Sequence, residues 1–340
     1  MQPRSNARMQ RPRFLPDNFM LMLLATVALA SLLPAQGAVA QGLGWATTAA
    51  VSLLFFLHGA KLSRAAILAG IGHWRLHAMV VGATFLLFPL LGWALRPVLS
   101  PLVTPELYIG VLFLCALPST VQSSIAFTAV ARGNMPAAIC AASGSTLMGI
   151  VFTPLLVGLL LGQSGGMGDP LSAVGRIALQ LLLPFIAGHL LQPVIGGFVK
   201  RRASVLKWVD QGSILLVVYA AFSHAVNDGL WTSMPLPALA GLALVCAVLL
   251  GGVMGLLVWS SRRLGFSKED EIAIVFCGSK KSLISGVPMA NVLFAANVAG
   301  AIVLPLMLFH QMQLMVCAYV ARRYAAREQL AEPDVAPERA

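Results

Sequence analysis

The sequence predicts an all-α polytopic membrane protein with about ten transmembrane helices. Of its 340 residues, 58% are hydrophobic and only 10% are charged. A soluble domain of this size needs roughly a quarter of its residues charged to cover its surface, so water is not the main solvent of this chain. One bilayer crossing takes about 20 apolar residues. The uninterrupted apolar stretches therefore set the architecture, which we expect to be one compact membrane unit.

The apolar stretches, read against glycine, proline and charged residues, give two sets of five expected helices. The first set covers residues 14–33, 42–62, 76–96, 104–131 and 135–162, and the second covers 171–193, 207–229, 236–259, 269–295 and 297–320. Because five is odd, a duplicated half must lie inverted relative to the first, as in many transporters. The expected divisions are a basic segment at 1–13, repeats at 14–162 and 171–320, and a disordered tail at 321–340.

The basic residues gather on one side of this ten-helix pattern. On that side fall 19 of the 23 Lys and Arg residues: Arg4, Arg8, Arg11, Arg13, Lys61, Arg64, Arg75, Arg132, Lys200, Arg201, Arg202, Lys207, Arg262, Arg263, Lys268, Arg322, Arg323, Arg327 and Arg339. Cytoplasmic loops are enriched in Lys and Arg, so we expect a bacterial inner-membrane protein with both termini in the cytoplasm. Topology thus accounts for the net charge of +11 without nucleic-acid binding.

The first apolar run has a second interpretation, as a cleaved signal peptide. Basic residues precede the run from Phe19 to Leu33, and Ala38-Val39-Ala40 resembles a cleavage site. The run is at the upper length limit for a signal peptide, and ten helices divide evenly into two repeats. We therefore favour a first transmembrane helix.

Polar residues interrupt two of the expected spans at matching positions of the two halves. The fourth span contains Pro118-Ser119-Thr120-Val121-Gln122-Ser123-Ser124, and the ninth contains Gly278-Ser279-Lys280-Lys281-Ser282. A proline followed by hydroxyl and amide side chains unwinds a helix locally. Any single Ser or Thr more often bonds to its own helix. Paired broken helices, however, indicate a solute or ion site near the membrane midplane.

Two lysines lie deep in the ninth span. Lys280 and Lys281 are about ten residues from either helix end, too far for the ammonium groups to reach an interface. An uncompensated charge at that depth costs several kcal/mol, and no Asp or Glu lies in the middle of a span. We expect at least one lysine to face a polar cavity, carbonyl groups or an anion, with His310 and Gln311 as supporting residues.

The motifs of several other protein classes are missing. The sequence contains no Walker A motif, HExxH, GxSxG or metal-spaced His and Cys cluster. The five cysteines fall within apolar stretches without CxxC pairing and are expected to be packing residues. The sequence therefore lacks the motifs required for ATP-driven pumping and for hydrolase chemistry.

At these same segments the sequence resembles the bile acid:sodium symporter family, in particular its SBF-like branch of bacterial members and a vertebrate orphan member. The resemblance covers almost the whole chain and rests on Phe55-Phe56-Leu57-His58-Gly59-Ala60-Lys61-Leu62-Ser63, Leu117-Pro118-Ser119-Thr120-Val121-Gln122-Ser123-Ser124, Ala131-Arg132-Gly133-Asn134, Phe276-Cys277-Gly278-Ser279-Lys280-Lys281-Ser282-Leu283 and Phe309-His310-Gln311. It implies ten helices in inverted five-helix repeats. It also implies a panel domain of helices 1, 2, 6 and 7, and a core domain of helices 3–5 and 8–10 whose broken helices 4 and 9 cross at the ion sites.

The sequence departs from its sodium-coupled relatives at the positions that the resemblance assigns to sodium. Where they have Ser-Asn, this chain has Ser123-Ser124, and their hydroxyl residues of the fifth helix fall on Ala138 and Ala142. Their third-helix glutamine falls on Thr84, and their ninth-helix glutamate and glutamine fall on Phe276 and Lys280. An ammonium at such a position repels Na⁺ and can substitute for it, or it can exchange a proton.

These observations favour a secondary transporter of an organic, anionic solute, embedded in the bilayer. No cofactor is expected; Na⁺ or H⁺ coupling stays open, with Ser123 and Ser124 as the only sodium candidates. The candidate solute- and ion-binding residues are Thr84, Ser119, Thr120, Gln122, Ser123, Ser124, Ser279, Lys280, Lys281, Ser282, His310 and Gln311. A non-transporting membrane regulator or scaffold and an intramembrane enzyme are the alternatives. The solute and the oligomeric state stay open.

The distribution of basic residues predicts the result of a topology experiment. A reporter fused after Ala340 should give a cytoplasmic signal, and one inserted near Gly165 a periplasmic signal, because Lys and Arg are retained on the cytoplasmic side. Paired alkaline phosphatase and green fluorescent protein fusions measure both. A periplasmic C-terminus would contradict the ten-helix pattern.

Overall fold

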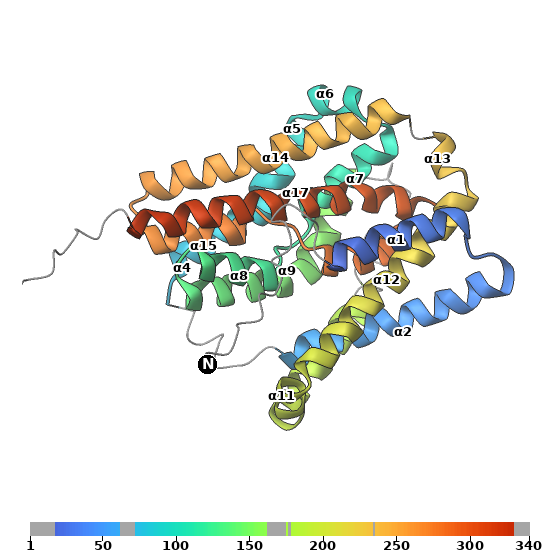
Figure 1. Cartoon of the computed structure of the whole chain (residues 1–340), viewed down its shortest axis with the longest axis horizontal. Coiled ribbons are helices and arrows are strands. Elements are labelled where there is room, and N and C mark those ends of the chain that lie inside the picture. The colour runs from blue at the N-terminus through green and yellow to red at the C-terminus, as the bar shows by residue number, and fades with distance from the viewer. Residues whose placement is uncertain (1–17, 62–71, 162–174, 176–177, 234, 330–340) are drawn as a thin grey trace, which may run out of the picture.

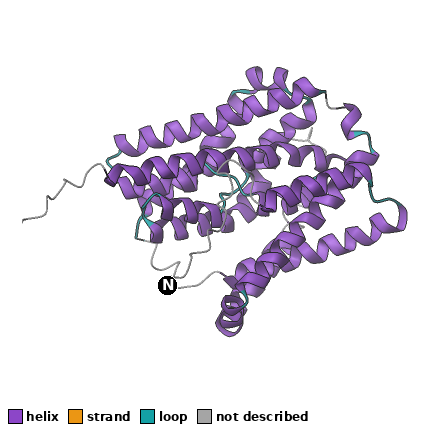
Figure 2. Cartoon of the chain, in the orientation of Figure 1, coloured by secondary structure: helices purple, strands orange, loops and turns teal. Residues whose placement is uncertain are grey.

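The computed structural model describes residues 18–61, 72–161, 175, 178–233 and 235–329, where every regular element is helical (Figures 1 and 2). Within this part of the chain, 8 helices are long and apolar enough to cross a membrane: Gly37–Lys61, Trp74–Ala94, Met135–Leu161, Leu179–Arg201, Ala203–Asn227, Leu236–Arg263, Lys268–Leu293 and Ala296–Ala326. Leu21–Leu32 and Pro105–Ala116 are shorter apolar helices. The prediction of an all-helical multi-pass membrane protein is confirmed.

The elements follow the expected spans in order. The first half contains α1 (Asn18–Leu32), α2 (Gly37–Lys61), α4 (Trp74–Gly82), the π-helical turn η1 (Ala83–Leu87), α5 (Phe88–Ala94), α6 (Arg96–Leu99), η2 (Ser100–Leu102), α7 (Pro105–Ala116), α8 (Gln122–Val130) and α9 (Met135–Leu161). The second contains η4 (Ala178–Leu182), α11 (Leu183–Arg201), α12 (Ala203–Asn227), α13 (Leu230–Ser233), α14 (Leu236–Arg263), α15 (Lys268–Gly278), α16 (Leu283–Leu293) and α17 (Ala296–Gln329). The predicted segments 1–13 and 330–340 lie outside the described residues.

Two predicted boundaries are wrong. The helix expected to end at residue 193 continues to Arg201, with Pro193 in its interior. Proline is tolerated inside membrane helices because neighbouring groups satisfy the freed backbone. The expected disordered tail is also wrong for residues 321–329, which extend α17. The Tyr324 ring packs edge-on against Phe276 of α15, with centroids 6.2 Å apart, so this extension has a packing partner.

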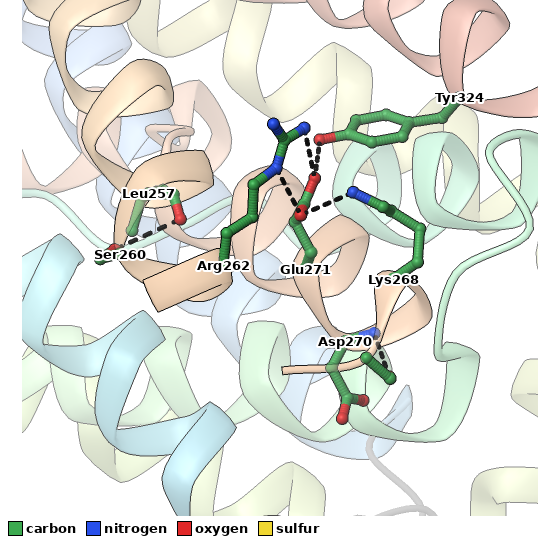
Figure 3. A network of polar contacts seen from close by, with 8 residues as sticks. Leu257, Ser260, Arg262, Lys268, Asp270, Glu271 and Tyr324 are labelled. Atoms are coloured by element: carbon green, nitrogen blue, oxygen red, sulfur yellow. Dashed lines mark hydrogen bonds and ion pairs between the residues drawn. The ribbon is translucent and has the colours of Figure 1, made fainter. Parts of the chain in front are cut away.

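A buried carboxylate ties three helices together at this end of the bundle (Figure 3). Glu271 is 2% exposed and accepts hydrogen bonds from Arg262 Nε at 3.1 Å, Lys268 Nζ at 2.8 Å and the Tyr324 hydroxyl at 2.8 Å. A buried charge is stable only when it is paired and hydrogen-bonded. The cluster thereby fixes α14, α15 and the last turns of α17 to one another.

The helices form two groups, and α12 belongs to the one that also contains α1, α2 and α11 (Figure 1). In one group α2 packs on α11 and α12, and α1 packs on α12. In the other, α7, α14 and α16 pack on α17, and α15 packs on α4, α8, α9 and α14. The two groups meet where α12 contacts α16 and α17.

Backbone contact holds α2 against α11. A Cβ added to Gly188 would lie 2.0 Å from the carbonyl oxygen of Phe56, and one added to Gly59 would lie 2.0 Å from that of Phe185. Small residues allow such close approach between membrane helices, where packing rather than the hydrophobic effect drives association. No side chain larger than hydrogen fits either position without separating the helices.

Gly188→Ala should therefore destabilise the protein by about 1–3 kcal/mol, the usual range for overpacking. Gly197→Ala is the matched control on the same helix, because nothing lies within 4 Å of its added Cβ. That change should be neutral or stabilising, since alanine favours helices over glycine by about 1 kcal/mol. Thermal unfolding of the purified variants measures both effects. Equal melting temperatures would contradict the backbone contact.

Candidate functional site

Both expected interruptions are breaks in the helices. α7 ends at Ala116 and α8 begins at Gln122, while α15 ends at Gly278 and α16 begins at Leu283. The two unwound segments meet, since the Ser282 backbone N–H donates to the carbonyl oxygen of Pro118 at 2.9 Å. The Ser124 hydroxyl donates to the carbonyl oxygen of Phe276 at 2.9 Å. The prediction that these segments approach each other is confirmed.

Lys281 satisfies carbonyl groups that the first break leaves free. Its side chain is 0% exposed, and its Nζ donates at 2.8 Å to each of three carbonyl oxygens, those of Thr84, Cys115 and Leu117. The Phe88 ring lies below the ammonium, 4.2 Å from Nζ to the ring centroid. The prediction that at least one deep lysine faces a polar cavity, carbonyl groups or an anion is confirmed for Lys281, whose partners are carbonyl groups.

A threonine hydroxyl and a backbone N–H donate to the neighbouring carbonyl groups of the first break that Lys281 does not contact. The Thr153 hydroxyl donates to the Ala116 oxygen at 2.9 Å, and Pro118 has its partner in Ser282. Each carbonyl oxygen from residue 115 to 118 thus has a donor. This matters because a backbone polar group without a partner costs several kcal/mol inside a membrane.

Lys280 lies in a different environment, although it is the next residue. It is also 0% exposed, and within the described structure its Nζ has no hydrogen-bond partner. The nitrogen faces the rings of Phe127 and Phe276, at 4.1 and 5.5 Å from their centroids. Cation–π attraction, worth about 2 kcal/mol when desolvated, is the interaction that this site offers.

Gln313, rather than the expected Gln311, supports the second break. Gln313 is 0% exposed; its Oε1 accepts from the Lys281 N–H at 2.8 Å, and its Nε2 donates to the Lys281 carbonyl at 2.9 Å. His310 Nδ1 lies 2.8 Å from the same Nε2. Gln311 Oε1 has no partner among the described residues. The helical period could have distinguished the two glutamines. Gln313 lies three residues after His310 and shares its helix face, whereas Gln311 is adjacent to His310 and does not.

The predicted hydroxyl residues differ in their hydrogen-bond partners. Thr120 Oγ1 lies 2.5 Å from Ser123 Oγ and 3.2 Å from Ser124 Oγ, which forms a hydroxyl cluster. Ser279 Oγ instead donates to the Val275 carbonyl of its own helix at 2.6 Å. The hydroxyls of Ser119 and Thr84 are buried without a partner in the described structure. Within it, no group of three or more His, Cys, Asp or Glu residues could hold a metal ion.

A cavity of about 180 Å³ lies between the two helix groups, lined from α1, α2 and α12 on one side and from both breaks and α17 on the other. Five predicted residues line it: Thr120, Gln122, Ser123, Ser282 and His310. The lining includes residues 120–123 and 282–285, so the first turns of α8 and α16 both border it. The other seven predicted residues are not among those that line it.

The cavity also has ionisable residues that were not among the predicted binding residues. His58, Lys207 and Asp210 line it, and Asp210 is 4% exposed and ion-paired with Lys61. A second hollow of about 370 Å³ shares Gln122, Lys207 and Asp210 with the cavity and adds Lys61 and Lys200. Asp210 was recognisable as a lone acid near the start of an apolar helix, but nothing in sequence pairs it with Lys61.

A helical multi-pass membrane protein whose two broken helices meet beside a cavity that polar side chains help to line has the construction of a secondary transporter. The chain belongs to the SBF-like CPA transporter family, whose family model matches residues 17–326. The resemblance to the SBF-like branch of the bile acid:sodium symporter family is thereby confirmed.

Individual relatives agree with this assignment. The chain is 64% identical over 319 residues, 94% of its length and 96% of the relative's, to an uncharacterized protein of Pseudomonas aeruginosa. It is 55% identical over 308 residues, 91% of its length and 92% of the relative's, to the Escherichia coli (strain K12) protein named "Putative symporter YfeH". It is 28% identical over 274 residues, 79% and 81% of the two chains, to Sodium/bile acid cotransporter 7 of Danio rerio. These names do not favour the regulator or scaffold alternative.

The contacts of Gln313 predict a difference between two neighbouring glutamines. Gln313→Leu should destabilise the protein by about 1–3 kcal/mol, because it leaves the buried N–H and carbonyl of Lys281 without partners. Gln311→Leu, the matched control one residue away, should cost less than about 0.5 kcal/mol. Thermal unfolding of both variants decides. A larger loss for Gln311→Leu would overturn the assignment of Gln313.

Proposed function

We propose that this protein is a secondary-active transporter of a small organic anion, working by alternating access at the cavity between the two helix groups. The observation that carries the proposal is the placement of two helix N-termini on one cavity. The first turns of α8 and α16 both border it. A helix N-terminus carries about half a positive charge, so two of them favour an anionic group.

We take the second hollow, which shares three lining residues with the cavity, as the mouth of the cavity, and the charges there also favour an anion. Lys61, Lys200 and Lys207 line this hollow, and Asp210 is the one acid among its described lining residues. Asp210 is already paired with Lys61. A mouth lined by one sign of charge raises the local concentration of oppositely charged solutes. An anion thus meets a positive entrance and then hydroxyl donors at Thr120 and Ser123.

The two helix groups provide two domains that can move relative to each other in alternating access. We assign α1, α2, α11 and α12 to a panel domain and the remaining spanning helices to a core domain, which with α7–α8 and α15–α16 each counted once gives ten spans in two inverted repeats. The lysines at the mouth belong to the side that basic residues place in the cytoplasm. In this assignment the protein lies in the bacterial inner membrane, both termini are cytoplasmic, and the described conformation opens inward.

The two deep lysines support a proposal about the coupling ion. Fixed ammonium groups beside the crossing repel a free Na⁺, and the Ser124 hydroxyl is committed to the Phe276 carbonyl. We therefore propose that transport does not require Na⁺ and that H⁺ or the solute gradient drives it. The names of the relatives that mention symport or sodium describe those relatives and do not assign a coupling ion to this chain.

Transport by the purified protein in liposomes tests this function. Solutes that raise its melting temperature, screened across small carboxylates, steroid sulfates and bile acids, should show counterflow in Na⁺-free buffer. Ser123→Ala should weaken apparent affinity about fivefold, the equivalent of one hydrogen bond of about 1 kcal/mol. Lys280→Gln and Lys281→Gln remove charge and should abolish transport or change its charge preference.

Thr48→Ala is the control, because Thr48 is exposed on α2 and its hydroxyl donates to the Gly44 carbonyl of its own helix in the described structure. With pH and Na⁺ varied independently, strict Na⁺ dependence of the wild type would contradict the coupling proposal. Counterflow of every screened solute at the rate of protein-free liposomes would contradict transport itself.

A further inference from the structure

We infer that the carbonyl oxygens of Thr84, Cys115 and Leu117 form a monovalent-cation site that the protein fills with its own Lys281 ammonium. Shortening Lys281 should therefore produce a protein that binds a free cation of ammonium size at that place. This inference concerns cation binding at the crossing and stands whether or not the cavity transports an anion.

The geometry around Lys281 Nζ is that of a coordinated cation. Three oxygens from two separate elements, η1 and the end of α7, lie at the same distance of 2.8 Å from the nitrogen. An ammonium has three N–H donors, which matches three acceptors, whereas a neutral amine has only two. All three acceptors are backbone carbonyls, the groups that replace a hydration shell in membrane ion sites.

The electrostatics of the site suit a cation without any carboxylate. Two of the oxygens belong to the C-terminal end of α7, where a helix carries about half a negative charge. The Phe88 ring presents its negative face to the same point, with its centroid 4.2 Å from the nitrogen. In the described structure no Asp or Glu is paired with Lys281.

The cradle has supports that do not depend on the ammonium. The Ala116 oxygen is held by Thr153 and the Pro118 oxygen by Ser282, so the unwound segment stays fixed on both sides of Leu117. The backbone of residue 281 is held separately by Gln313. Removal of the side chain should thus leave three converging oxygens and a vacated channel in place of a collapsed break.

The distances also predict which cation binds. Potassium and ammonium ions have nearly the same radius, and both fit oxygens 2.8 Å away. Sodium and lithium are smaller and would need the carbonyls to move inward. We expect K⁺ and NH₄⁺ to bind Lys281→Ala more tightly than Na⁺, and choline, which is too large, not to bind.

Thermal unfolding of the purified full-length chain tests the site. Wild type should melt at the same temperature in KCl, NH₄Cl, NaCl and choline chloride at equal ionic strength. Lys281→Ala should melt lower in choline chloride and gain a saturable increase, on the order of a few °C, in KCl or NH₄Cl. Lys280→Ala is the matched control, because the Lys280 ammonium lies over an aromatic ring and has no hydrogen-bond partner in the described structure; this variant should show no such recovery.

Recovery of the variants from membranes keeps the test decisive if Lys281→Ala is too unstable to purify. Fluorescence-detected size exclusion after extraction should then show a folded peak in KCl that is lost in choline chloride. Loss of the peak in both salts would overturn the inference, as would a stable Lys281→Ala whose melting temperature ignores the cation. An equal K⁺ response in Lys280→Ala would also overturn it, because the effect would not be specific to the cradle.

Discussion

Unwound backbone at membrane depth requires a partner for every freed carbonyl group, and the crossing of the two broken helices meets that requirement. The carbonyl oxygens of residues 115 to 118 accept hydrogen bonds from Lys281, Thr153 and Ser282, which lie far from them in the sequence. In the other direction, the Ser124 hydroxyl donates to the carbonyl oxygen of Phe276 in the second half. Because each unpaired group would cost several kcal/mol in hydrocarbon, this exchange makes the breaks possible and positions the cavity beside them.

The same constraint separates two kinds of positive charge. Lys281 is enclosed by carbonyl groups and fixed by its neighbours, so it belongs to the structure of the crossing. Lys207 lines the cavity and its mouth and is exposed, so it is available to a solute. The Lys281 charge is thereby stabilised locally by carbonyl dipoles, while charge at the mouth acts on what approaches. This division is consistent with an anion site next to an ammonium that itself contacts no anion.

Composition, apolar runs and proline position predict the helices and both breaks, because these features depend on local sequence and on membrane thickness. They also predict that a deep lysine needs a polar cavity, carbonyl groups or an anion, because the cost of burial does not depend on fold. They do not predict which lysine, because Lys280 and Lys281 differ only in the direction that the unwound backbone gives them. Nor do they pair Asp210 with Lys61, since that contact depends on how α2 and α12 pack.

A tethered cation has a consequence for energy coupling. A free Na⁺ can bind on one side and leave on the other, whereas the Lys281 ammonium stays with the core throughout the proposed cycle. The membrane potential then acts on the solute and any accompanying proton, at about 2.3 kcal/mol per charge per 100 mV. An interior-negative potential opposes the entry of an anion carried alone and favours its exit. Uptake by this protein would therefore need either an inward solute gradient large enough to overcome the potential or at least one proton per anionic charge, whereas export would need neither.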